Sequence, residues 1–132
     1  MRRNDTEVVA EVRAAFLAYE EALVSGDLTT MADYFDDASD LVRFGIGDEE
    51  RGPEELAAWR AAQGPHRVGR TLRDTVVATF GSDVGIVSTA FSYPDRPWRG
   101  RQSQVWLRRE GEWKIVHAHV SEIADLDVAR GD

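Results

Sequence analysis

A single arginine interrupts a short apolar segment of the sequence, DLVRFGIG, at residues 40–47. The segment predicts a β-strand in which Arg43 lies among side chains that belong in a protein core. A guanidinium group keeps its charge, so burying it requires an anion or several carbonyl acceptors nearby. The sequence leaves two partners open. One is a neighbouring carboxylate, from Asp36, Asp37 or Asp40; the other is the carboxylate of a ligand, which matches the planar fork of arginine.

A tyrosine, Tyr19, lies on the apolar stripe of a predicted helix, between Phe16 and Leu23. Two roles fit this position. A buried tyrosine can pack in the core while its hydroxyl reaches a polar partner. The hydroxyl can also point into a pocket and donate a hydrogen bond to a developing negative charge.

Two histidines, His117 and His119, alternate with an alanine near the end of the chain. On a regular strand both would share a face with Trp113 and Ile115. Such a pair can begin a metal site, pack in the core or line a pocket. The sequence offers no further cluster of metal ligands, so we expect no metal. We expect one histidine in the core and the other, His119, in the pocket as a proton shuttle or carboxylate donor.

Polar side chains also alternate in the segment GRQSQ, at residues 100–104. We expect Gln104 to point inward together with Trp106. An amide there would suit a urea-like ligand, which presents both donors and acceptors. On a predicted helix, Trp59 either belongs to the core or, with Arg60, covers the pocket.

The elements that must position these residues follow a simple order. Caps and periodicity predict helices at residues 5–25, 28–34 and 51–64, and β-rich runs follow at residues 70–80, 84–93, 99–109 and 112–123. Helices first and strands last indicate an α+β fold, with three N-terminal helices packed on a curved antiparallel sheet. Helices packed on a curved sheet form a cone, and the open end of a cone suits a small-molecule pocket. We expect a single domain at residues 5–124 and a tail at residues 125–132.

The composition limits the partners of the chain. Its 24 acidic and 16 basic residues give a formal charge of −8, which argues against nucleic acid and anionic membranes. An anionic substrate must then be held by locally placed arginines. The chain has no cysteine, which excludes thiolate chemistry, and no apolar run long enough to span a membrane. We therefore expect a cytoplasmic protein.

Three segments together resemble a known family: LVRFGIGDEERGPEELAAWRAAQ, RTLRDTVVATFG and GRQSQVWLRREGEWKIVHAHVS. They are similar to the AtzH-like proteins of the nuclear-transport-factor-2 superfamily, which also includes ketosteroid isomerases. The resemblance runs from Val8 to about Ile123. It implies a cone-shaped fold and a decarboxylating amidohydrolase activity on a carboxylated urea, giving allophanate, or on an oxalurate-type compound. It implicates Tyr19 and Arg43 in catalysis.

These expectations combine into an enzyme that needs no cofactor and acts on a small anionic urea-like substrate. The outer sheet face, expected to carry Val77, Val87 and Phe91, would form a homodimer. Two alternatives remain open. The chain could be a dimeric, non-catalytic subunit of a partner amidase, or it could transfer a proton as ketosteroid isomerase does, with an aspartate as base.

Overall fold

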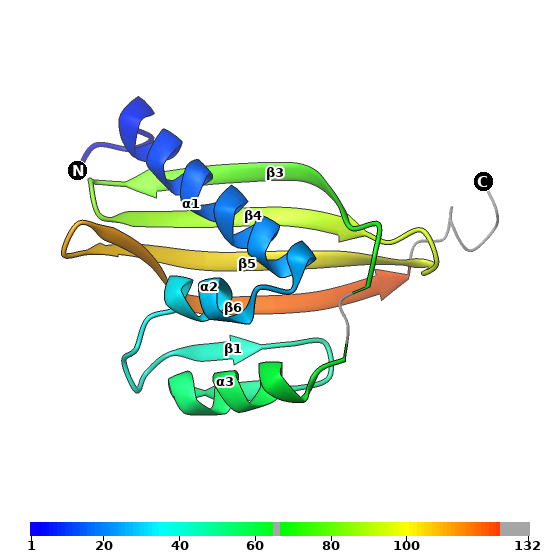
Figure 1. Cartoon of the computed structure of the whole chain (residues 1–132). Coiled ribbons are helices and arrows are strands. Elements are labelled where there is room, and N and C mark those ends of the chain that lie inside the picture. Colours follow the sequence, from blue (N-terminus) through cyan, green and yellow to red (C-terminus); the bar gives the residue numbers. More distant parts are fainter. Residues whose placement is uncertain (65–66, 125–132) are drawn as a thin grey trace.

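Three helices cover one face of a six-stranded sheet in the computed structural model, which describes residues 1–64 and 67–124 (Figure 1). The predicted tail at residues 125–132 lies outside the described residues. The helices are α1 (Thr6–Ser25), α2 (Leu28–Tyr34) and α3 (Gly52–Ala62). The strands are β1 (Val42–Phe44), β2 (Glu49–Arg51), β3 (Thr71–Phe80), β4 (Val84–Ser92), β5 (Trp98–Arg109) and β6 (Glu112–Ala124).

The helix boundaries follow from capping residues. The Asp5 side chain accepts hydrogen bonds from the first backbone N–H groups of α1, and Gly26 ends that helix with a φ of 72°, a conformation that glycine adopts without steric cost. Asp27 caps α2 by accepting from the Thr30 N–H at 3.1 Å. The first two predicted helices are thereby confirmed, and α3 ends two residues before the predicted Gly64.

The sheet has the order β2-β1-β6-β5-β4-β3, and the last four strands form the predicted antiparallel meander. One pairing departs from the predicted antiparallel sheet: β1 pairs with β6 in parallel, so the whole sheet is mixed. The short strand β2 was not predicted, since its charged residues, Glu49–Arg51, give no strand signal. In Figure 1, α1 runs diagonally across β3, β4 and β5, while α3 lies beside β1.

A β-bulge near the start of β6 determines which side chains face the helices. Val105 pairs with His117 but the next residue, Trp106, pairs with Ile115, so Val116 has no partner across the ladder. An extra residue in one strand reverses the alternation of faces beyond it. Ile115 lies on the helix side before the bulge and Ala118 lies there after it, and both are buried.

The core fills the space between the helices and the sheet. Phe16, Trp106 and Ile115 are fully buried there. The prediction that Val77, Val87 and Phe91 form the outer sheet face is wrong: all three are buried on the inner face, and the exposed Ile86 lies on the other side. The face of β4 that carries Gly85 and Val87 lies against α1, where Val12 leaves no space for a side chain at Gly85.

No helix in the described part of the chain is long and apolar enough to cross a membrane.

Candidate functional site

A cavity of about 550 Å³ lies between the helices and the inner face of the sheet. Its inner end is formed by buried side chains, including Tyr19, Phe35 and Gln104, whereas its mouth lies near Gly26 and Gly64. Among the described lining residues none is acidic, and four are arginines: Arg43, Arg60, Arg67 and Arg70.

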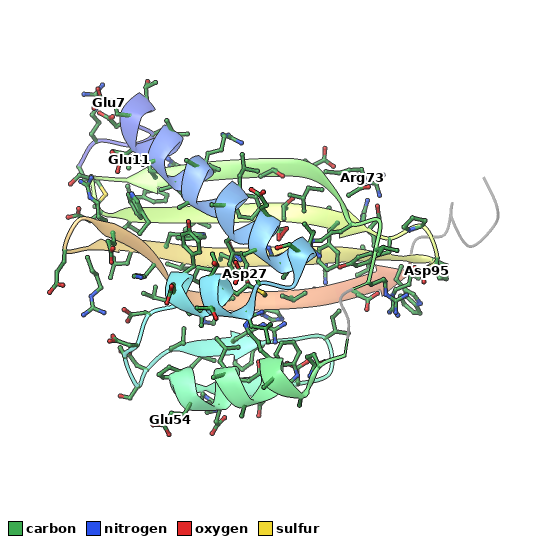
Figure 2. The ribbon with its side chains drawn as sticks, viewed as in Figure 1. Glu7, Glu11, Asp27, Glu54, Arg73 and Asp95 are labelled. Carbon is green, nitrogen blue, oxygen red and sulfur yellow. The ribbon has the colours of Figure 1, made fainter. Side chains whose placement is uncertain are left out.

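Carboxylates dominate elsewhere in this chain of formal charge −8. Figure 2 shows Glu7 and Glu54 on the outer sides of α1 and α3, away from the space between helices and sheet. Three of the four lining arginines, Arg43, Arg67 and Arg70, have carboxylate partners. The lining charge without such a partner among the described residues is Arg60, and it favours an anionic ligand at the inner end.

Arg60, on α3, was considered as a cover of the pocket together with Trp59, but its contact with Tyr19 was not predicted. Its side chain reaches across to α1 and α2, and the residue is only 9% exposed. Nη2 donates to the Tyr19 hydroxyl at 2.7 Å, and Nη1 contacts the Met31 sulfur at 3.8 Å. Nε is buried without a hydrogen-bond partner, and the described residues give this guanidinium no carboxylate. A signal was available, since Arg60 follows the buried Leu56 by four residues and so shares its helix face.

Tyr19 combines the two roles that the sequence left open. Its ring is buried and meets the rings of Tyr34 and Phe35 edge-on, at centroid distances of 6.3 Å and 5.7 Å. The residue also lines the cavity. Because its oxygen accepts from Arg60, the hydroxyl hydrogen remains available to donate to another group.

Arg43 lines the same cavity, but it has protein partners. Nη1 donates to Asp48 Oδ2 at 2.7 Å and to Glu50 Oε1 at 2.8 Å, and the guanidinium lies 4.1 Å from the centre of the Trp59 ring. Arg43 therefore forms an ion pair, but the predicted partners Asp36, Asp37 and Asp40 are wrong. The pairing of β1 with β2 places Glu50 opposite Arg43 instead.

The Arg43 pair leaves part of the guanidinium unused, since Nε and Nη2 bond no described residue. Burial raises the pKa of Glu50, as does its hydrogen bond with Asp48, while Arg43 acts in the opposite direction.

Two glutamines of β5 face the cavity. Gln104 is 2% exposed, and its Oε1 accepts from the Trp106 indole N–H at 3.0 Å. An indole can only donate, so this bond fixes the amide with its NH₂ group directed away from Trp106. Gln102, which the sequence analysis did not select, has a buried Nε2 without a partner.

The histidines His117 and His119 were predicted to bind the substrate, but the structure places them away from the cavity. Neither residue lines the cavity; Ala118 and Val120 do. The bulge at Val116 turns both histidines to the outer face, where they meet the Phe44 ring edge-on at 6.0 Å and 5.5 Å. Trp59 does line the cavity.

A buried ion pair joins α1 to the segment before β3. Arg70 donates through Nε and Nη2 to Glu20 Oε1, at 3.1 Å and 2.9 Å, and lies 4.0 Å from the centre of the Phe91 ring. Burial raises the pKa of Glu20, although Arg70 counteracts this effect through charge and hydrogen bonding.

The raised pKa of Glu20 has a measurable consequence. The folded protein holds this proton more tightly than the unfolded chain, so the contribution of Glu20 to the free energy of unfolding is fully present below the usual value of 4.5 and is lost as the pH rises through the folded pKa. In a carbon-13 carboxyl NMR titration, we expect a glutamate resonance with a midpoint above 4.5 that is absent from Glu20→Gln. A midpoint at or below that value would show that Arg70 outweighs burial.

Within the described residues there is no group of three or more histidines and carboxylates placed to hold a metal ion.

Helices on one face of a curved sheet, enclosing a cavity at its inner face, define the nuclear-transport-factor-2-like class. At this fold level the chain is similar to a ketosteroid isomerase-like protein from Erwinia carotovora atroseptica, with a TM-score of 0.72 and 19% identity over 91% of this chain and 99% of that one. Within the class, the AtzH-like family profile matches residues 1–126, and the chain belongs to that family.

Two solved structures are much more similar in sequence. A cystatin-like fold protein from Burkholderia xenovorans is 44% identical over 94% of this chain and 98% of that one, with a TM-score of 0.91. A protein of unknown function from Pectobacterium atrosepticum is 38% identical over 92% of this chain and 95% of that one, with a TM-score of 0.90. No functionally curated protein matches the chain.

Proposed function

We propose that the protein is a decarboxylating amidohydrolase-type enzyme that converts a small carboxylated urea, such as 1,3-dicarboxyurea, to allophanate, or acts on a related oxalurate-type compound. The observation that carries this proposal is the cavity of about 550 Å³, whose described charged lining residues are all arginines. A compact dianion is small enough to enter such a space, and arginines bind its carboxylates.

The reaction requires little beyond positioning and a proton. The bond between the ureido nitrogen and the carboxylate carbon breaks, carbon dioxide leaves, and the nitrogen keeps the bonding electrons and takes up one proton. Arg43 holds the carboxylate that is retained, through the nitrogens that Asp48 and Glu50 leave unused. Tyr19 donates its hydroxyl hydrogen to the ureido group, on which negative charge develops.

The test is turnover by the purified protein. Freshly prepared 1,3-dicarboxyurea labelled with carbon-13 is added, and allophanate and carbon dioxide are followed by NMR. We expect allophanate to form well above the rate in buffer alone. If the folded protein gives only the buffer rate, the assignment of this reaction is withdrawn.

The outer sheet face favours a second, compatible role in assembly. Val76 and Ile86 are exposed there, on neighbouring strands. A homodimer through this face would cover them, and the same surface is available to a partner amidase if the chain is an accessory subunit in the cytoplasm. A ketosteroid-isomerase-like proton transfer finds less support, because the described cavity lining contains no carboxylate to act as base.

A further inference from the structure

The assigned reaction gives no role to the most isolated charge of the cavity. Arg60 is 9% exposed and has no carboxylate partner among the described residues. Removing a guanidinium from water without an anion is strongly unfavourable. Aromatic faces compensate in part, with the Phe35 and Tyr19 ring centres 5.1 Å and 5.8 Å from the guanidinium carbon. Neither ring satisfies the buried Nε.

The unsatisfied polar atoms of the cavity are of one kind. Of the buried side-chain atoms without a partner in the described structure, two belong to residues that line the cavity, namely Arg60 Nε and Gln102 Nε2. Both are N–H donors. Gln104 adds a third donor, because Trp106 occupies its oxygen. The two unpaired atoms are covered by neighbouring side chains, so the donors that the inner end offers a ligand are the Gln104 NH₂ group and the Tyr19 hydroxyl, beside the positive charge of Arg60.

Arg60 and Arg43 serve different parts of the cavity. Arg43 lies on the Trp59 ring and bonds Asp48 and Glu50. Arg60 follows Trp59 directly on α3, so it projects about 100° further round the helix, and it contacts residues of α1 and α2. The two guanidinium groups share no bonded partner.

We propose that Arg60, the Gln104 NH₂ group and the Tyr19 hydroxyl form an anion hole for the ureido oxygen of the ligand, separate from the carboxylate clamp at Arg43. This inference rests on the proposed function for the ureido group. When the bond to the departing carboxylate breaks, the electron pair left on nitrogen spreads onto the neighbouring carbonyl oxygen. Donors placed around that oxygen stabilise the charge as it develops. Arg60 also positions Tyr19, because it occupies the phenol oxygen and directs the hydrogen to the ligand.

The experiment compares two cyclic ureides by isothermal titration calorimetry. Barbiturate is an anion at neutral pH with its charge spread over the oxygens, whereas uracil is neutral and of similar size. Wild-type protein should bind barbiturate at least tenfold more tightly than uracil. Arg60→Met should lose that preference, and Arg13→Met, which changes an exposed arginine of α1, should keep it within twofold. An unchanged preference in Arg60→Met overturns the anion hole.

Stability distinguishes this role from a structural one. Because Arg60 is an uncompensated buried charge, Arg60→Met should unfold at the same temperature as the wild type or higher. Should this variant fail to fold, the Arg60 Nε–Hε signal of wild-type protein decides. It must shift on addition of barbiturate, and a static signal overturns the proposal.

The two proposals fail separately. Barbiturate preference without turnover of 1,3-dicarboxyurea removes the reaction and keeps the anion hole. Turnover without that preference keeps the reaction and removes the anion hole. If both hold, Arg60→Met should lower kcat with little change in KM, because the oxygen carries its charge only in the transition state.

Discussion

Replacement of Tyr19 by phenylalanine should lower kcat for the carboxylated urea by about 100- to 1,000-fold. The substitution removes the hydroxyl that faces the ligand and also the acceptor that Arg60 Nη2 uses at 2.7 Å. The ring and its edge-on contacts with Tyr34 and Phe35 remain, so the fold should persist. Steady-state kinetics by NMR, with circular dichroism as a check on folding, measures the effect.

Tyr34 provides a matched control for this change. It also belongs to the aromatic cluster and its ring meets that of Trp106 at 5.9 Å, but it does not line the cavity and its hydroxyl makes no hydrogen bond in the described structure. Tyr34→Phe should leave kcat within about threefold of the wild type. Equal losses in the two variants would mean that the hydroxyl of Tyr19 has no special role.

Replacement of Trp106 by alanine should lower the free energy of unfolding by about 3–5 kcal/mol. Trp106 is fully buried on β5, where it packs against Tyr34 and bonds Gln104 at 3.0 Å. Its loss opens a large cavity between α2 and the sheet and leaves the Gln104 oxygen without its donor. Urea denaturation followed by circular dichroism gives the value.

Trp98 begins the same strand and is 44% exposed. Trp98→Ala should therefore cost less than about 1 kcal/mol. A Trp106→Ala variant as stable as Trp98→Ala would contradict the packing described for the core. In the folded fraction of Trp106→Ala, anion binding should also weaken, because Gln104 is free to rotate its amide.

The sequence was sufficient for most of the architecture. Asp5, Gly26 and Asp27 have local capping roles that depend on near neighbours only, so they could be recognised without a structure. The same is true of the four long strands, whose turns lie at the Gly-Ser-Asp, Pro-Asp-Arg-Pro and Glu-Gly segments. The parallel pairing of β1 with β6 joins segments about 75 residues apart, and no local pattern encodes it.

Within the candidate site, positions on regular elements were predicted correctly, including Gln104 on β5, and the error lies beyond the β-bulge of β6. Tyr19 and Trp59 line the cavity because helix faces are fixed by regular steps. His117 and His119 were misplaced because one unpaired residue in β6 reverses the faces. The contact of Arg60 with Tyr19 was not predicted because it joins α3 to α1 across 41 residues of sequence.

The unpaired residue in β6 also affects how relatives should be aligned. The number of residues between Trp113 and Ala118 decides which later side chains meet the ligand, whatever their identities. A homologue one residue shorter in this interval would exchange the two sides of the strand beyond it, bringing the positions of His117 and His119 inside. A single insertion or deletion could therefore change ligand preference more than several substitutions.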